Sequence, residues 1–153
     1  MGRTYGNNCT QIGGKGEDLA CKWLADNGFE ILERNWRCGH LEIDIIAVGR
    51  KGESPADPGS CSNESYASQF SAASSGDRRY IHFIEVKMRK AGAIVSPVEA
   101  VNRRKREVLI MAAEGYIKSH HIKIEALFDI LAITYSNSRY SIEFIEGAFA
   151  PCW

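Results

Sequence analysis

The chain has 153 residues, which is enough for one domain with a sizeable core and too few for two domains of ordinary size. Hydrophobic residues make up 44% and charged residues 25%, as in ordinary globular proteins, and the net charge of zero argues against a protein that coats nucleic acid indiscriminately. The five scattered cysteines form no C-x-x-C pair, and no signal peptide or long apolar run is visible, so we expect a single cytoplasmic domain without a zinc site, a disulfide framework or a membrane span.

The first predicted element is a helix. Residues 1–12 are polar and unpatterned, and we expect a loose arm there. A helix is predicted over 13–27, because apolar residues recur at helical spacing up to Leu24 and Gly28 follows as a left-handed cap. Glu17 lies on or beside the inward stripe of this helix, where it is either a functional acid or an exposed carboxylate favoured by the helix dipole.

Two strands are predicted next, over 29–37 and 41–48, joined by a short turn. The second carries Glu42 and Asp44 on one face, where two acids repel unless a cation, basic groups or protonation relieves them. A solvated edge strand is the alternative, which the apolar neighbours of Asp44 disfavour. A period of two divides this strand into one face with Glu42, Asp44 and Ile46 and another with Ile43, Ile45 and Ala47.

The segment 50–79 differs in composition from the rest of the chain. It is rich in Ser, Gly, Ala and Asp, contains Pro55 and Pro58, and shows no apolar period. A structureless connection of that length is unusual inside a compact domain. We therefore predict a disordered insertion between two neighbouring strands, with low relevance to chemistry, although a regulatory or partner-binding loop is compatible with the same composition.

The segment 80–89 predicts a strand that is covered on both faces, because it is mostly apolar, β-branched and aromatic as far as Glu85. Glu85 and Lys87 project from the same face of this strand. A carboxylate and an ammonium group at the end of a buried strand are costly to desolvate unless they are paired or coordinate something. This pair is the first indication of a functional site.

A second helix is predicted over 96–119, because the Ser-Pro-Val-Glu start at Ser96 combines a capping box with proline at the first helical position. Lys105 falls within its buried stripe, where it either snorkels to the edge or contacts phosphate directly. The apolar residues expected on that stripe are Val101, Val108, Leu109, Ala112 and Tyr116. The arginines expected to point outward are Arg103, Arg104 and Arg106.

The last predicted strands span 126–135 and 140–145. Asp129 interrupts the first of them and is best explained as a polar residue that is hydrogen-bonded to the backbone or to a basic neighbour. The order of helix, three strands, helix and two strands indicates an α/β fold with a mixed sheet of about five strands. In that sheet the hairpins are antiparallel and the helical crossover is parallel.

Four predicted site residues can converge if the first helix packs beside the ends of two adjacent strands: Glu17, Asp44, Glu85 and Lys87. Asp44 and Glu85, with a backbone carbonyl, offer the oxygen ligands that Mg²⁺ or Mn²⁺ prefers, and such a cation stabilises charge developing on a phosphodiester. Lys87 would orient or help to deprotonate the attacking water. Between residues 87 and 106, seven basic residues accompany one acid, which suits phosphate recognition about as well as a solvated helix face.

Several blocks spread over the chain carry a family resemblance: Gly16-Glu17 with Ala20, Asn35-Trp36-Arg37, Glu42-Ile43-Asp44, the run from Phe83 to Arg89, Ala100-Val101 with Lys105, and Phe128-Asp129. Together they resemble the YraN-like family of bacterial proteins, which is similar to archaeal-type Holliday junction resolvases of the restriction-endonuclease-like fold. The resemblance implies a D…E-x-K pattern that binds metal and cleaves DNA, with Asp44 and Glu85 as metal ligands, Lys87 as the catalytic lysine and Glu17 as the helix carboxylate. Two positions depart from the family pattern, Leu41 in place of a glycine and Leu127 in place of a basic residue beside Asp129.

The leading hypothesis is therefore a nuclease that depends on Mg²⁺ or Mn²⁺ and cuts DNA, including branched DNA, in a restriction-endonuclease-like domain that is compatible with a homodimer. The residues expected to contact nucleic acid are Arg37, Arg89, Arg103, Arg104 and Lys105. The alternative is a nucleic-acid-binding or partner-docking module that keeps the fold without cutting. A purely structural acidic cluster is a third explanation, in which Asp44→Asn would raise stability by relieving repulsion while changing no binding.

Overall fold

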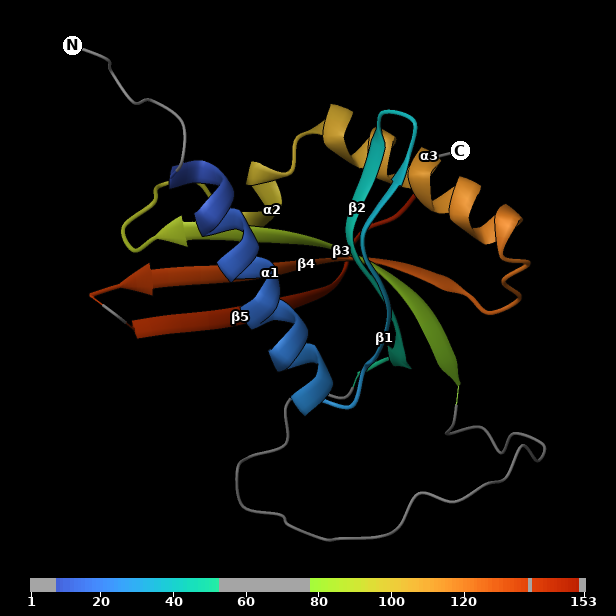
Figure 1. The fold of residues 1–153 in the computed structure, drawn as a ribbon, viewed down its shortest axis with the longest axis horizontal. Helices are drawn as coiled ribbons and strands as arrows, with labels where there is room; N and C mark the ends of the chain where they lie inside the picture. The colour runs from blue at the N-terminus through green and yellow to red at the C-terminus, as the bar shows by residue number, and fades with distance from the viewer. Residues whose placement is uncertain (1–7, 53–77, 138, 152–153) are drawn as a thin grey trace, which may run out of the picture.

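The computed structural model describes residues 8–52, 78–137 and 139–151 (Figure 1). The elements are α1 (Asn8–Asp26), β1 (Glu30–Cys38), β2 (Leu41–Arg50), β3 (Arg79–Lys90), α2 (Pro97–Ala100), α3 (Arg103–Ser119), β4 (Ala126–Ser136) and β5 (Arg139–Phe149). The predicted order of helix, three strands, helix and two strands is confirmed, with the short helix α2 in addition. Within the described part of the chain, no helix is both long and apolar enough to cross a membrane.

Two sequence predictions fall partly on residues outside the described ranges. The predicted loose arm covered residues 1–12, of which 1–7 lie outside; residues 8–12 are helical, so the prediction of an arm is wrong for them. The predicted insertion covered 50–79, of which 53–77 lie outside the described residues. Its flanks belong to strands, since Arg50 ends β2 and Arg79 begins β3.

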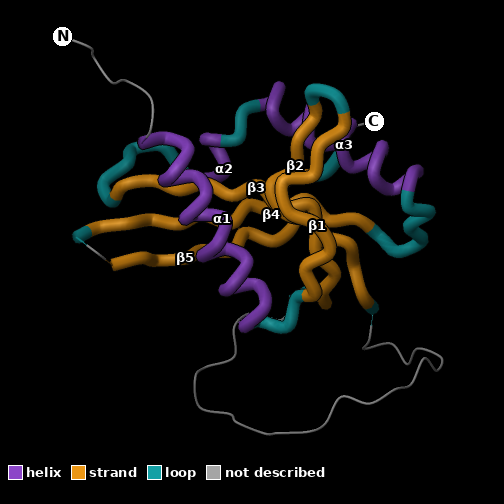
Figure 2. The backbone as a smooth tube through the Cα atoms, viewed as in Figure 1, coloured by secondary structure: helices purple, strands orange, loops and turns teal. Residues whose placement is uncertain are grey.

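The five strands form one mixed sheet in the order β1-β2-β3-β4-β5, a single twisted layer with the helices outside it (Figure 2). The pairs β1–β2, β2–β3 and β4–β5 are antiparallel, and β3–β4 is parallel. The parallel pair follows from the connection through α2 and α3, which returns the chain to the starting end of β3. The predicted α/β fold and the arrangement of its sheet are therefore confirmed.

Two helices cover opposite faces of the sheet. On one face, Ala20 and Leu24 of α1 pack against Ile84 of β3. On the other, Leu109 of α3 packs in a cluster with Phe83. In Figure 1, α1 crosses in front of the sheet, whereas α3 lies behind β2. Burying each large apolar side chain contributes about 1.5–3 kcal/mol, so β3, covered on both faces as predicted, anchors the fold.

The alternation of side chains along β2 breaks at Asp44. Ile43 and Ile46 lie in the same apolar cluster, against α3, while Ile45 packs on the side of α1. The prediction that Ile43 shares a face with Ile45 is therefore wrong. Asn35 of β1, which lies between the partners of Ile43 and Ile45, has a φ of 50°. A residue with positive φ interrupts the regular pleat, which explains the change of face.

The single helix predicted over 96–119 is in fact two helices. The predicted capping box at Ser96 is present and starts α2, which ends at Ala100. Asn102 then caps α3, because its side chain accepts a hydrogen bond of 2.9 Å from the backbone amide of Lys105. Asn favours such bonds to its own backbone over the helix interior, so a second start competes with continuation of the first helix.

Arg106 does not point outward as predicted. Its guanidinium donates hydrogen bonds to the carbonyl oxygens of Val98, at 2.9 Å, and Val101, at 2.8 Å. It also lies 5.5 Å from the centre of the Phe149 ring. The carbonyl of Val98 also accepts a hydrogen bond of 3.3 Å from the amide of Val101, so Arg106 adds a second bond there and links the end of α2 to the start of α3. The predicted buried stripe is confirmed for Val101, Leu109, Ala112 and Tyr116, while Val108 is half-buried.

Asp129 is fully buried and hydrogen-bonded, as its sequence context predicted. One carboxylate oxygen lies 2.7 Å from Nδ1 of His82, and the other accepts a bond of 2.8 Å from the amide of Gly147. The bond links β3, β4 and the bulge of β5. His82 on β3, opposite Leu127 in the ladder, thus supplies the basic partner that Leu127 cannot provide.

Candidate active site

The candidate site lies where β2 and β3 separate. Their ladder runs as far as the pair Ile45–Ile84, and Asp44 is the next residue of β2. Its Oδ2 accepts a hydrogen bond of 2.8 Å from the backbone amide of Val86. The side chain thereby replaces a backbone acceptor at the point of divergence, which keeps this amide satisfied. Asp44 is consequently tied to the residue that directly follows Glu85.

Glu85 lies between two lysines and is only 2% exposed. Its Oε1 is 2.8 Å from Nζ of Lys87, as expected for neighbours on one face of a strand, and its Oε2 is 3.1 Å from Nζ of Lys105 on α3. Both contacts are ion pairs. Oε2 is fully enclosed, and the ammonium group of Lys105 compensates its charge in the interior.

The charges of Asp44, Glu85 and Lys105 act on one another. Burial, followed by the negative charge of Glu85, raises the pKa of Asp44 to about 6, while the Val86 amide and Lys105 oppose that rise. Burial lowers the pKa of Lys105, but the negative charges of Glu85 and Asp44 outweigh burial, so that pKa is raised overall. Lys105 therefore stays charged next to the two acids.

Glu17 lies at the rim of this site. It is half-buried on α1, and Nδ2 of Asn35 donates a hydrogen bond of 2.6 Å to its Oε2. The charge of Glu17 acts weakly on Asp44, as the last of the influences that raise the pKa of Asp44. The structure thus brings Asp44, Glu85 and Lys87 together and places Glu17 beside them. Asn35 is a neighbour that only the resemblance had marked, since strand periodicity gives no sign of its positive φ.

The three residues of α3 that were predicted to contact nucleic acid differ in their exposure to solvent. Arg103 and Arg104 are exposed in the first turn of α3, and Arg103 forms a salt bridge of 2.8 Å with Glu107. Lys105 turns inward to Glu85. Its place between Val101 and Val108 on the buried stripe was the sequence signal for this orientation, although the sequence did not name its partner.

The other two predicted contacts lie further from α3. Arg37, on the hairpin of β1 and β2, forms an exposed salt bridge of 3.0 Å with Glu42. Arg89 is half-buried, and its guanidinium donates to the carbonyl of Val95 and, at 3.5 Å, to the hydroxyl of Thr134. Arg89 therefore braces the loop after β3, while Arg37 remains open to solvent.

The oxygen donors at this site fit a hard divalent cation. The charges of the Asp44 and Glu85 carboxylates act on each other, and Oε2 of Glu85 is an enclosed oxygen for which a cation would compete with Lys105. Over the described ranges, no three His, Cys, Asp or Glu side chains are grouped so as to hold a metal ion. A cation would therefore keep several water ligands, which is the usual behaviour of Mg²⁺.

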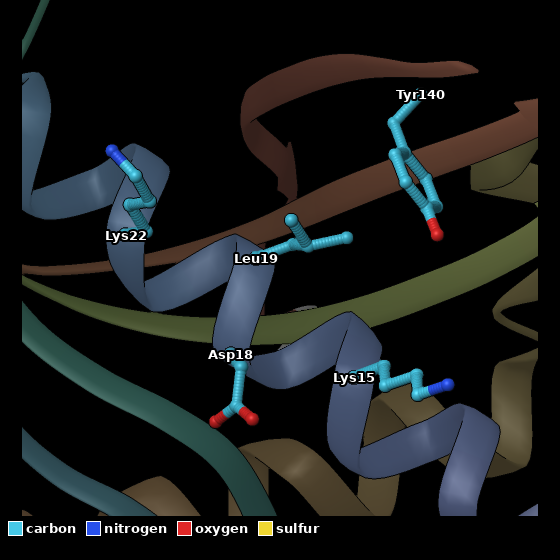
Figure 3. Close-up of a pocket in the computed structure, with 5 residues that line it drawn as sticks. All are labelled: Lys15, Asp18, Leu19, Lys22 and Tyr140. Carbon is cyan, nitrogen blue, oxygen red and sulfur yellow. The ribbon is translucent and has the colours of Figure 1, made fainter. Parts of the chain in front are cut away.

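A separate pocket of about 330 Å³ lies between α1 and β5 (Figure 3). Leu19 extends from α1 towards the ring of Tyr140 on β5, and Lys15 and Lys22 lie along the same helix. Asp18 points away from Tyr140 and pairs with Arg34 of β1. None of the predicted site residues lines this pocket. The candidate site around Asp44 and Glu85 and this pocket are thus at different places on the molecule.

The fold and the site define an α/β protein with a restriction-endonuclease-like core, in which two acids and two lysines meet at the divergence of β2 and β3. The chain belongs to the uncharacterised protein family UPF0102, whose family profile matches residues 16–133, and the resemblance to the YraN-like family is thereby confirmed. A UPF0102 protein of Clostridium botulinum (strain 657) is 35% identical over 142 residues, covering 90% of this chain and 93% of the relative. UPF0102 proteins of Phocaeicola vulgatus and Bacteroides thetaiotaomicron are each 30% identical over 141 residues, covering 92% of this chain and 93% of the relative.

Proposed function

We propose that this protein is a metal-dependent nuclease that hydrolyses DNA phosphodiester bonds. The observation that carries the proposal is the convergence of Asp44, Glu85 and Lys87 at the point where two central strands separate. Burying two like charges beside each other is costly, as the raised pKa of Asp44 indicates. A fold without a use for these acids would be more stable without them.

Each residue has a role in this proposal. Asp44 and Glu85 would hold Mg²⁺ or Mn²⁺, which supplies stabilisation of the negative charge that develops on the phosphodiester. Lys87, whose side chain is 32% exposed, lies between the buried acid and solvent and would orient the attacking water. Glu17, held by Asn35, would orient a second water at the rim.

We extend the proposal to branched DNA as substrate and to a homodimer as the active species. Cutting both strands of a junction requires two active sites, which a symmetric dimer supplies. Chromosomal DNA would place this activity in the cytoplasm. The measurement is the mass of the protein in solution, alone and with a labelled four-way junction; a monomer that cuts simple duplex better than the junction would contradict this extension.

Cleavage assays test the nuclease itself. Labelled duplex, junction and single-stranded DNA are incubated with Mg²⁺ or Mn²⁺ and with wild type, Glu85→Gln or Lys87→Ala. We expect each variant to reduce the cleavage rate by about 100-fold or more, because each removes a group that acts on the reacting atoms. Glu143→Gln on β5 and Lys118→Ala at the end of α3 alter exposed residues away from the site and serve as controls. Equal product from wild type and Lys87→Ala would remove the proposed mechanism.

One observation favours a second function. Both oxygens of Glu85 already face ammonium groups, so this carboxylate is compensated without a cation. A nucleic-acid-binding module that does not cut would show salt-sensitive DNA binding that survives Glu85→Ala and needs no divalent ion. Titration calorimetry with Mn²⁺ distinguishes the two, because such a module should give no heat that depends on Asp44 and Glu85.

A further inference from the structure

We infer that Lys105 is an exchangeable counter-ion of Glu85, which compensates the carboxylate while no cation is bound and moves out towards the DNA backbone when a divalent cation takes its place. The inference rests on the proposed function, because it requires a cation site at Asp44 and Glu85. It adds a positioning role for a residue of α3 that lies outside the E-x-K pattern.

The two lysines contact different oxygens of Glu85 and come from different elements. Lys87 approaches Oε1 from the same strand at 2.8 Å, whereas Lys105 approaches Oε2 from a different element at 3.1 Å. The charge of Lys105 also acts on Asp44, whereas Lys87 is not among the groups that influence Asp44, so a cation held by both acids would lie on the side of Lys105. The lysine that must give way to such a ligand is Lys105.

The charge around Lys105 explains why a cation would displace it. Three carboxylates act on its ammonium group, those of Glu85, Asp44 and Glu42. A divalent cation bound between Asp44 and Glu85 would satisfy the same negative charge and would repel the nearby ammonium group. The divalent cation and the ammonium group therefore compete for the same oxygens, and the doubly charged ion is attracted to them more strongly.

The position of Lys105 on α3 allows its ammonium group to move from Glu85 to the protein surface. Its side chain is 34% exposed, so rotation about its own bonds can bring Nζ to the surface. Its backbone is fixed by the Asn102 cap, and the neighbouring Arg103 and Arg104 are exposed. A released Lys105 would thus extend a basic surface at the start of α3, where phosphate groups can be contacted.

The test uses Lys105→Met, which keeps most of the side-chain length and removes the charge. Titration calorimetry with Mn²⁺, without DNA, should give a dissociation constant lower by roughly tenfold for the variant, because a repelling charge is gone. Without a cation the variant should melt at a lower temperature than wild type, since Oε2 loses its counter-ion, and Mn²⁺ should raise its melting temperature more than that of wild type. Arg104→Met, on the exposed neighbour, should change neither quantity.

The outcomes distinguish this inference from the proposed function. If wild type binds no Mn²⁺ in a manner that depends on Asp44 and Glu85, the proposed function and the inference both fail. If wild type binds Mn²⁺ and Lys105→Met binds it equally or more weakly, the exchange alone is overturned and Lys105 is a permanent structural counter-ion. Lys105→Gln, which keeps a hydrogen-bond donor near Glu85, is measured in parallel and gives the same comparison of affinities if the methionine variant does not fold.

Discussion

At the scale of single residues, the ionised carboxylate of Asp44 is destabilised by its surroundings in the folded protein. Its ordinary pKa of 3.8 is raised to about 6, by burial first and by Glu85 second. Because the folded protein holds the proton more tightly than the unfolded chain, ionising Asp44 destabilises the cation-free fold. The cost is absent below the unfolded pKa, grows as the pH rises through the folded pKa, and amounts to about 3 kcal/mol above it.

Replacing Asp44 by Asn should therefore stabilise the cation-free protein. In the presence of a chelator at pH 7.5, we expect Asp44→Asn to raise the free energy of unfolding by about 1–3 kcal/mol, because the amide oxygen still accepts the Val86 hydrogen bond without a charge. At pH 4 the gain should largely disappear. Urea denaturation at both pH values measures it, with the exposed Asp26→Asn as control. A gain of equal size at both pH values would contradict the assigned cause.

The buried pair of His82 and Asp129 should behave in the opposite way. Asp129→Ala leaves both the His82 ring and the amide of Gly147 without their partner in the interior. We expect a loss of about 3–5 kcal/mol in the free energy of unfolding, measured by urea denaturation. Glu143→Ala, on the exposed side of β5, should change it by less than about 0.5 kcal/mol. Similar effects of the two substitutions would show that the buried pair is not important for stability.

At the scale of elements, the break between α2 and α3 decides where the side chain of Arg106 points. Val101 and Asn102 leave the helical conformation, with ψ angles of 88° and 165°, and a new helix starts at Arg103. Arg106 turns back to the end of α2 and donates to the carbonyl groups at the break, whereas Lys105 faces Glu85 from the buried stripe on which the sequence already placed it.

Close packing also fixes the contact between the end of β2 and the residue that precedes β1. Gly49 lies against the ring of Phe29, where an added Cβ would be 2.5 Å from Cδ1, and Phe29 in turn contacts the ring of His82. We expect Gly49→Ala to cost about 1–3 kcal/mol by overpacking. Gly14→Ala, in the exposed part of α1 with open space around it, should instead add up to about 1 kcal/mol. Thermal melts of both variants measure this contrast, and a stabilising Gly49→Ala would contradict the close packing.

At the scale of the whole molecule, a neutral protein concentrates positive charge in one region. Seven basic residues and one acid lie between residues 87 and 106, although the net charge is zero. Arg103 and Arg104 are exposed within this region, while Arg89 and Arg106 donate hydrogen bonds to backbone carbonyl groups. Phosphate contacts should accordingly concentrate at the start of α3 rather than spread over the whole surface.

Salt dependence measures this distribution of charge. We expect DNA binding to weaken steeply with salt, and the double variant Arg103→Ala/Arg104→Ala to reduce the slope of log affinity against log salt by roughly 1–2. The control is Lys118→Ala/Lys123→Ala, which removes the same number of charges at the other end of α3, about 25 Å away. Fluorescence anisotropy with labelled duplex measures both. Equal losses for the two double variants would exclude a localised DNA-binding surface.

The sequence by itself determined the order of the elements, the mixed sheet and the neighbours Glu85 and Lys87, because these depend on periodicity and turn residues within short segments. Only the tertiary structure decided the partners that come from different elements. Lys105 meets Glu85 because α3 covers the face of β3 that carries Phe83 and Glu85, and His82 meets Asp129 because β3 and β4 are parallel neighbours in a particular register. Likewise, Ile43 changes face next to a left-handed Asn35, since local twist depends on how two strands pair and not on the residue types of one strand.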